Sequence, residues 1–570
     1  MRRIAVLMGI LLILSGQPAA AQEGSGALVI DSASLPDISV LYPRLFAVDE
    51  MGRLMPATVA NGGLIESWTV EFGDFSPDND LSQSETRVVF MLREDAFWAD
   101  GTRVNAYDVF RSIEQNWRRF GDGLRIAEWS FVVPVSEESL VMVYEGDSCS
   151  ALEAQGNSTI TAADRSGPWT VDLRNLMMSD GDSLDQRYEE ARSLIYGSPD
   201  MNSADQFQAV SAQHQYVERT DDHERYRIGD LALTVETSRF GDRLDEVNDF
   251  ISGELDVIVN PPYVYRSDLR AVPDIQIVEQ VGRTWYALGF NFVDSSEPLD
   301  AFDEKTGEPQ EQRAHPFFSH LKVREAVRLA LDINALGAAA TAGHYTPLAS
   351  DQLPWSWAYN PDIPMPEYDP FDAAQILEGL GWRDWDGDGV RECQGCATAE
   401  TGQPLWFSLT YDEDDLQQII VARGIQEQLA RIGVGVEFWP YYGSASILGA
   451  VAGQTFDAYL LRITERSPVA ADRALLYRQS EDRLNSGVNV TSYVNPEMEA
   501  VFDRAAHAPD CDYDARAEGL SEASALIYED IPYLPLFAGN DFYAAQGWVG
   551  GFAPRQNDPF WNMADWVVNR

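Results

Sequence analysis

The stretch DWDGDGVRECQGC, residues 384–396, gathers the residue types in this chain that could bind a metal or do redox chemistry. A calcium loop carries a bidentate glutamate at its position 12, where this chain has Gly395, and the only nearby glutamate, Glu392, stands at position 9. The missing ligand favours a glycine-rich turn between a helix and a strand, so no metal is expected. The residues that fit positions 1, 3, 5 and 6 of such a loop are Asp384, Asp386, Asp388 and Gly389.

The cysteine pair in the same stretch does not have the setting of a redox centre. A reactive CxxC usually lies at a helix N-terminus, whose dipole lowers the thiol pKa. Cys396 is followed instead by ATAETGQP and a strand-like run. A zinc site would need both distant cysteines, Cys149 and Cys511, to converge on the pair. We therefore favour a small hairpin disulfide, Cys393–Cys396.

Signatures of catalysis are sparse. The sequence contains no HExxH, GxSxG, Walker loop or strand-borne GxGxxG, and its six histidines form no ligand-spaced cluster. Acidic residues are so abundant that no carboxylate pair stands out. We expect no enzymatic activity and no cofactor. The 15 tryptophans and 23 tyrosines are more informative, because aromatic side chains in loops, such as Trp355 and Trp357, are common at ligand clefts.

The N-terminus and the charge limit the cellular context. Residues 1–21 read as a secretory signal, with two arginines, a short apolar run and an Ala-x-Ala cleavage site. No cysteine lies near that site, so we expect a periplasmic protein without a lipid anchor. With 41 basic and 91 acidic residues, the net charge of −50 argues against nucleic acid and anionic lipid as partners. An oxidising compartment favours disulfides, and of the three pairings we prefer Cys149–Cys511 with Cys393–Cys396.

The helices and strands that must position these residues are predicted to form an α/β fold. Residues 108–117 place Val109, Ile113 and Trp117 on one helical face, and residues 323–331 do the same with Val323, Val327 and Leu331. Residues 421–432 form a third amphipathic helix, with Gly433 where a helix end favours glycine. Residues 405–411 alternate as a strand does. At 570 residues, the chain predicts more than one domain.

Several segments, in chain order, resemble one family: the family 5 extracellular solute-binding proteins of ABC importers, the oligopeptide, dipeptide and nickel-binding class. The resemblance extends over most of residues 61–570. The segments that carry it include VVFMLREDAFWADGTRVNAYDVFRSIE, RLDEVNDFISGELDVI, HPFFSHLKVREAVRLALDI, EYDPFDAAQILEGLGWRDWDGDGVRE and VARGIQEQLARIGVGVEFWP.

This resemblance implies an α/β, two-lobed periplasmic binding protein fold with a hinge and an extra N-terminal subdomain. It also implies a ligand enclosed between the lobes and an inner-membrane ABC permease as partner, with the chain acting as a monomer. In the family, the Asp-Gly-rich stretch is a turn, so the aspartates look structural. The expected division is a signal peptide at 1–21, lobe I at 22–65, 201–290 and 536–570, an additional subdomain of lobe I at 66–200, and lobe II at 291–535.

The resemblance leaves the ligand open. Oligopeptide-binding members carry an aspartate about ten residues beyond the Phe-Asp that matches Phe456-Asp457, and it pairs with the α-ammonium of the peptide. Here that place falls on Arg466, or on Glu465 if the alignment shifts by one residue. Arg466 would favour a carboxylate or phosphate, whereas Glu465 would favour an ammonium group. Arg462 and Arg466 could instead pair with the acidic surface.

We therefore predict the substrate-binding component of an ABC importer, for peptides or a related small solute. The alternatives are a secreted enzyme, or a sensor or chaperone without transport, on the same scaffold. A catalytic cluster in the cleft would favour the enzyme. The candidate ligand-binding residues are Asn291, Trp355, Trp357, Tyr441, Tyr442, Arg462, Glu465 and Arg466. Asn291 could instead cap its strand, and any one of the four aromatic residues could instead belong to the core.

Overall fold

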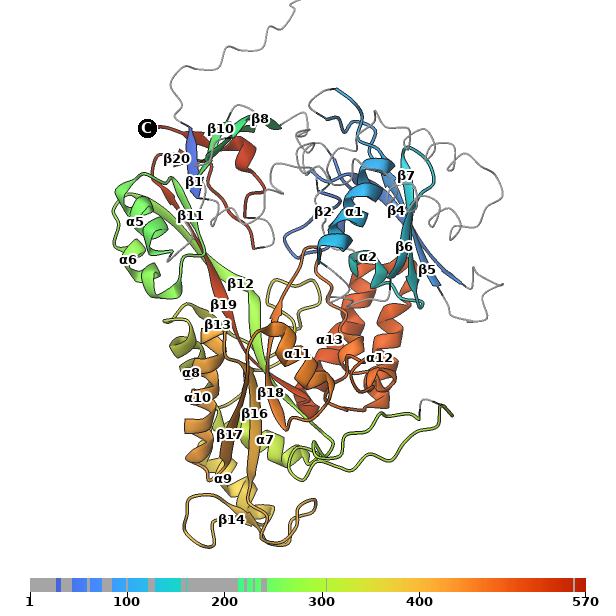
Figure 1. Ribbon diagram of the computed structural model, residues 1–570, viewed down its shortest axis with the longest axis vertical. Helices are drawn as coiled ribbons and strands as arrows, with labels where there is room; N and C mark the ends of the chain where they lie inside the picture. Colours follow the sequence, from blue (N-terminus) through green and yellow to red (C-terminus); the bar gives the residue numbers. More distant parts are fainter. Residues whose placement is uncertain are drawn as a thin grey trace, which may run out of the picture.

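A computed structural model describes most of the chain beyond the predicted signal peptide (Figure 1). The described residues are 27–31, 44–58, 62–73, 85–98, 101–120, 129–154, 160, 214–219, 223–228, 231–236, 243–303, 305–556 and 559–570. The predicted signal peptide, residues 1–21, lies outside them. No helix in these ranges is both long and apolar enough to cross a membrane.

One large sheet runs through both predicted lobes. Its strands follow the order β17-β16-β18-β12-β19-β11-β1-β10-β9-β8, and β13 pairs with β19 off this path. The long antiparallel pair β12 and β19 lies in the middle and continues from one lobe into the other (Figure 1). The bounds are β1 Leu28–Asp31, β8 His214–Arg219, β9 His223–Ile228, β10 Leu231–Glu236, β11 Val257–Val259, β12 Ile275–Phe290, β13 Tyr345–Pro347, β16 Trp406–Asp412, β17 Gly435–Tyr441, β18 Ala458–Thr464 and β19 Tyr533–Gln546.

The second half of β12 shows how lobe II is built in layers. Side chains alternate across a strand, so Tyr286, Leu288 and Phe290 enter one core and Trp285 and Ala287 enter the other. The first core lies under α7, α8, α9 and α10, and the second lies against α11, α12 and α13. The bounds are α7 Leu321–Ala330, α8 Ile333–Ala340, α9 Pro370–Gly379, α10 Leu416–Ala430, α11 Ser444–Ala452, α12 Pro496–Ala506 and α13 Tyr513–Asp530.

Local sequence sets the ends of these helices. A side-chain oxygen at the N-cap accepts one of the main-chain N–H groups that a helix start leaves unpaired. Asp415 does this for α10, Asn495 for α12 and Asp512 for α13. Beyond α10, Gly433 has a φ of 79°, which glycine adopts without a steric penalty. The three predicted helices and the predicted strand are all present, and the predicted core residues of α7, α10 and β16 are buried.

Lobe I packs its own two cores around the other end of β12 and β19. The first half of β12 contributes Ile275, Ile277 and Val278 to these cores. The β12–β19 register is irregular between Val281 and Trp285, several residues before the predicted lobe boundary at residue 290. A Cβ on Gly282 would lie 2.1 Å from the Gly539 carbonyl oxygen, so the two strands approach closely where the lobes meet. The remaining bounds are α5 Leu244–Ser252, η5 Tyr263–Tyr265, α6 Arg266–Arg270, β20 Val549–Gly550, β21 Val567–Val568 and η9 Met563–Asp565.

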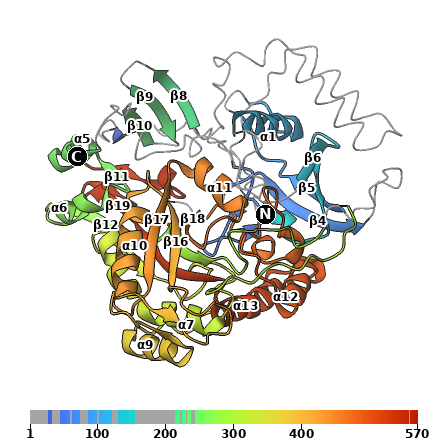
Figure 2. The ribbon, with the colours of Figure 1, turned by 60° about the horizontal axis from the view of Figure 1, so that its bottom comes forward.

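The subdomain has a separate sheet and core, and residues 44–58 and 62–65, which were expected in lobe I, pack into that core. Its four strands follow the order β4-β5-β7-β6, and β5 alternates strictly between buried and partly buried side chains. Helix α1 covers this sheet with Val109, Phe110 and Ile113. The views in Figures 1 and 2 both place the subdomain beside α12 and α13. The bounds are β2 Ala47–Val48, β3 Leu54–Met55, β4 Ile65–Gly73, β5 Glu85–Leu92, α1 Ala106–Phe120, β6 Trp129–Pro134, β7 Ser139–Glu145 and α2 Ala151–Ala154.

Candidate ligand-binding edge of lobe II

Three strands of lobe II end at the same edge of the sheet. β16 runs parallel to both β17 and β18, so their carboxyl ends lie together. Ligands of parallel α/β sheets bind outside the carboxyl ends of the strands. We call residues 412–415, 441–443 and 462–466 the carboxyl edge. Helix α11, which follows β17 there, lies on the side of lobe II that faces lobe I and the subdomain (Figure 2).

The loop after β16 fixes the loop after β17. The Asp412 carboxylate accepts hydrogen bonds from the main-chain N–H groups of Asp414 (3.0 Å) and Gly443 (3.1 Å). The Glu413 N–H donates to the Tyr441 carbonyl at 2.8 Å. Tyr441 is half-buried against the core, whereas Tyr442 is 70% exposed. Of the two predicted tyrosines, Tyr442 therefore offers its ring to an incoming molecule.

Arg462 is held by the acidic loop. Its Nη1 donates to Asp415 Oδ2 at 3.0 Å, while the other Asp415 oxygen caps α10 by accepting from Gln418 N–H. Burial, the largest single influence, would lower the pKa of Arg462, but the hydrogen bond to Asp415 and the negative charges of Asp415 and Asp412 together outweigh it and raise the pKa. Arg462 thus remains cationic and its charge is balanced within the protein, as the acidic-surface alternative predicted.

Glu465 lies in a buried charge network behind the edge. Its Oε1 accepts from Trp285 Nε1 at 2.9 Å and from Arg473 Nη2 at 2.5 Å. Arg473 Nε lies 3.5 Å from Asp351 Oδ2, and all three charged side chains are less than 10% exposed. Burial raises the pKa of Asp351, although Arg473 and Ser524 oppose this effect. The Glu465 carboxylate is therefore already paired, and an ammonium group would have to compete with Arg473.

Arg466 differs from its neighbour. Its side chain is exposed, and within the described part of the chain no hydrogen bond or ion pair joins it to another residue. Glu465 and Arg466 are adjacent in sequence, but of these two only Arg466 presents an exposed charge at the carboxyl edge, where Asp414 is exposed as well.

Asn291 lies inside lobe II. Its Nδ2 donates to the carbonyls of Gln454 (3.0 Å) and Phe456 (2.9 Å), and its Oδ1 accepts from Val293 N–H. The side chain is fully buried, so it ties the end of β12 to the approach to β18. This matches the alternative in which Asn291 caps the strand.

Trp355 and Trp357, candidate loop aromatics of a ligand cleft, lie in the core instead, because a distant part of lobe II covers them. They are 8% and 5% exposed and belong to the core beneath α12 and α13. Trp357 Nε1 donates to the Val469 carbonyl at 3.0 Å, and its ring packs edge-on against Tyr513. Stacking on a ligand would require this core to open.

The opening stretch forms a turn between two short strands, β14 (Trp382–Arg383) and β15 (Glu392–Cys393). The Asp384 carboxylate accepts from the N–H groups of Gly387 (2.7 Å) and Gly389 (3.1 Å), as expected of a structural turn. The group in the described residues that could supply metal ligands is Asp384, Asp386, Asp388 and Glu392, whose oxygens lie within 4.8 Å of one another.

The structure joins Cys393 to Cys396 and Cys149 to Cys511, the pairing that the sequence analysis preferred. Three residues outside the predicted site decide which charges are free: Asp415, Arg473 and Trp285. Asp415 had a local signal, because it ends the run of acids that precedes α10. Arg473 and Trp285 had none, since each meets Glu465 only through the tertiary fold.

Comparison with known families finds a match to the middle of the chain. The model of the family described as "Bacterial extracellular solute-binding proteins, family 5 Middle" matches residues 219–483, which include β12 and the whole carboxyl edge. The middle of this chain is therefore similar to the family 5 extracellular solute-binding proteins.

Two curated relatives agree with the family 5 assignment. The oligopeptide-binding protein AppA of Bacillus subtilis is 25% identical over 252 residues, which span 44% of this chain and 44% of AppA. The peptide transport periplasmic protein SapA of Salmonella typhimurium is 22% identical over 535 residues, which span 90% of this chain and 83% of SapA.

Solved structures of family 5 proteins share the two-lobed fold. AppA of B. subtilis, in complex with a nonapeptide, has a TM-score of 0.57 at 18% identity, covering 96% of this chain and 99% of AppA. NikA of Brucella suis, in complex with Fe(III)-EDTA, has a TM-score of 0.62 at 16% identity, covering 95% of this chain and all of NikA. The two-lobed α/β prediction is therefore confirmed.

Proposed function

We propose that this protein is the periplasmic substrate-binding component of an ABC importer and that it binds a peptide or a related small solute between its lobes. The observation that carries the proposal is the similarity to SapA, a peptide transport protein, along 90% of the chain. The fold supports it, because β12 and β19 connect two lobes whose closure would enclose a ligand.

The carboxyl edge is the proposed contact surface for the ligand. Tyr442 supplies an exposed aromatic face, and Tyr441 supports it from the core side. Arg466 is the proposed partner of an anionic group, since Arg462 and Glu465 are occupied by Asp415 and Arg473. In this proposal Asn291, Trp355 and Trp357 shape lobe II from within.

The proposed cellular setting follows from the predicted signal peptide and the acidic composition. Export would place the protein in the periplasm, where an inner-membrane ABC permease would receive the loaded form. The net charge of −50 makes nucleic acid an unfavourable partner. We propose that the protein acts as a monomer and has no catalytic role.

A thermal melt of refolded, ligand-free protein with and without a mixed di- to pentapeptide pool tests this function. At about 100 times Kd a ligand stabilises the folded state by ~2.7 kcal/mol. Each kcal/mol raises the midpoint by roughly 2–4 °C in a large domain, so we expect a shift of several degrees. Free amino acids at equal concentration are the control. A midpoint that the pool leaves unchanged would contradict peptide binding.

Blocked peptides sharpen the test of the site. If Arg466 binds the peptide carboxylate, C-terminal amidation of the pool should reduce the shift, whereas N-acetylation should leave most of it. The Arg466→Gln variant should then respond equally to free and amidated pools. The opposite pattern, loss on acetylation alone, would instead assign the main contact to a carboxylate.

A further inference from the structure

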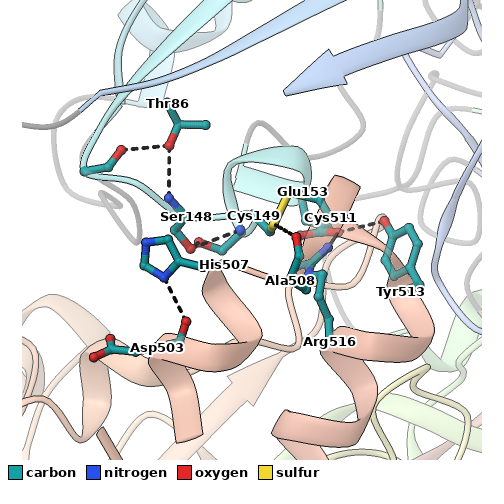
Figure 3. The surroundings of a disulfide bond; sticks show 12 residues. Thr86, Ser148, Cys149, Glu153, Asp503, His507, Ala508, Cys511, Tyr513 and Arg516 are labelled. Atoms are coloured by element: carbon teal, nitrogen blue, oxygen red, sulfur yellow. Dashed lines mark hydrogen bonds and ion pairs between the residues drawn. A yellow bond between two sulfur atoms is a disulfide. The ribbon is translucent and has the colours of Figure 1, made fainter. Parts of the chain in front are cut away.

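The subdomain is inserted between β1 and β8 of lobe I in sequence, yet a disulfide joins it to lobe II. Cys149, just before α2, bonds to Cys511 in η8 (Pro509–Cys511), which connects α12 to α13 (Figure 3). The two cysteines are 362 residues apart, and they are 0% and 4% exposed. Thr86 holds the preceding loop, because its Oγ1 donates to the Gly146 carbonyl and accepts from Ser148 N–H.

A buried ion pair lies beside the disulfide. Arg516 on α13 makes two parallel hydrogen bonds to Glu153 on α2, at 2.8 and 2.9 Å, and the side chains are 1% and 0% exposed. The Tyr513 hydroxyl donates to the same carboxylate at 2.7 Å. Glu153, Tyr513 and Arg516 lie together next to the disulfide in Figure 3. Such a fork geometry aligns both partners, and separating them would leave a buried charge unpaired.

Main-chain hydrogen bonds extend the junction. The Cys149 N–H donates to the Ala506 carbonyl at 2.8 Å, at the end of α12. In the turn between β2 and β3, the carbonyls of Met51 and Gly52 accept from the N–H groups of Trp357 (3.0 Å) and Val469 (2.9 Å). Both donors belong to lobe II. The core of the subdomain itself includes Cys511.

Toward lobe I, one contact among the described residues is an exposed ion pair. Arg555 and Glu50 form an ion pair at 3.4 Å with side chains that are 36% and 72% exposed. An exposed pair of this kind contributes little, because solvent screens it.

We propose that the Cys149–Cys511 disulfide and the Glu153–Arg516 ion pair form a two-part clasp that makes the subdomain one rigid body with lobe II. Lobe movement then takes place between lobe I and this combined body, although the subdomain belongs to lobe I in sequence. The clasp itself stands apart from the proposed solute binding, whereas its consequence for ligand capture rests on that function.

Distance measurements between spin labels test the clasp. Noncanonical amino acids carry the labels, so that all four cysteines keep their bonds. One label replaces the exposed Glu94 in the subdomain, and the second replaces either Glu518 on α13 or Glu254 in lobe I. In ligand-free oxidised protein we expect a narrow distribution for Glu94–Glu518 and a broader one for Glu94–Glu254. A Glu94–Glu518 distribution as broad as the Glu94–Glu254 distribution would overturn the proposal.

Variants separate the two parts of the clasp. Cys149→Ala/Cys511→Ala should broaden the Glu94–Glu518 distribution, and adding Glu153→Gln should broaden it further. The matched control, Cys393→Ala/Cys396→Ala, should leave it unchanged. Wild type treated with a phosphine reductant gives the same comparison without mutation. An unchanged distribution after reduction, with loss of the Cys149–Cys511 bond verified by mass spectrometry, would remove the disulfide from the clasp and contradict the proposal.

The peptide pool distinguishes the clasp from the proposed function. With the pool, the Glu94–Glu254 distance should shift while Glu94–Glu518 stays fixed. A shift confined to Glu94–Glu518 would mean that the subdomain travels with lobe I and would refute the clasp. If the pool shifts neither distance, the proposed peptide binding is wrong. The widths of the two distance distributions in ligand-free protein still show whether the clasp exists.

Discussion

Lobe II presents two surfaces whose charges are arranged in opposite ways. At the junction with the subdomain, Glu153 and Arg516 are fully buried, pair in a fork and lie next to a disulfide. At the carboxyl edge, Tyr442 is 70% exposed and Arg466 has no partner among the described residues. The buried charges of the first surface are paired with each other, whereas the second surface leaves an aromatic ring and a cation facing outward.

This difference separates structural from functional charge. A buried charge without a partner costs several kcal/mol, so removing either member of the buried ion pair should lower the free energy of unfolding strongly. An exposed charge or ring costs little to keep or to change, and it can exchange water for a ligand. We therefore expect junction variants to alter stability and edge variants to alter binding.

Breaking the buried ion pair should have the largest effect. Arg516→Leu leaves the Glu153 carboxylate buried without its cation, so we expect a loss of about 3–5 kcal/mol in the free energy of unfolding. Urea unfolding followed by tryptophan fluorescence measures it. Arg504→Leu on α12 is the matched control, because its pair with Glu522 is about half exposed and should contribute about 0.2–1 kcal/mol. Equal losses for both variants would contradict the contrast between buried and exposed charge.

Removing the long-range disulfide should have the second largest effect on the free energy of unfolding. Cys149→Ala/Cys511→Ala should lower the free energy of unfolding by roughly 2–5 kcal/mol, since the bond closes a long loop in the unfolded chain. The Cys393–Cys396 bond joins residues only 3 positions apart, so its removal in Cys393→Ala/Cys396→Ala should cost less. Calorimetry of the two double variants gives the comparison. A larger loss from the short-range pair would show that loop length does not govern these bonds.

The junction should also weaken as pH rises. The pKa of His507 is raised by its hydrogen bond to the Asp503 carbonyl, against the opposing effect of partial burial, and by the Asp147 carboxylate across the junction. A raised pKa stabilises the fold fully below the unfolded value of about 6.5, and this contribution is lost as pH rises through the folded value. The difference in melting midpoint between wild type and His507→Gln should therefore shrink from pH 5 to pH 8. A difference that grows with pH would have the wrong sign for this account.

The smallest effect on stability should come from the carboxyl edge. Tyr442→Ala should change the free energy of unfolding by no more than about 0.5 kcal/mol, because an exposed ring loses little when truncated. The same variant should reduce the midpoint shift caused by the peptide pool. Tyr368→Ala, 40% exposed in the loop before α9, is the control that should keep the full shift. An undiminished shift in Tyr442→Ala would remove Tyr442 from the site.

Local sequence patterns predicted the helices and strands, but not which distant residues contact the candidate site residues. Val421, Ile425 and Leu429 predicted α10, since helical spacing alone decides which face is buried. For Trp357 the sequence left both a cleft and a core position open, because Val469 and Tyr513, which cover it, lie more than 100 positions away. The sequence left open, for the same reason, whether Glu465 or Arg466 faces the ligand. Only the fold brings Arg473 and Trp285 to its carboxylate.

Small-angle X-ray scattering of refolded, ligand-free protein, before and after addition of the peptide pool, tests the central claim most directly. The account predicts that lobe I closes on lobe II and the subdomain, so the radius of gyration should fall when the pool is added. The fall should persist in the Cys393→Ala/Cys396→Ala variant. An unchanged radius of gyration at saturating pool, in protein whose melting midpoint also does not move, would contradict a peptide-binding protein that closes around its ligand.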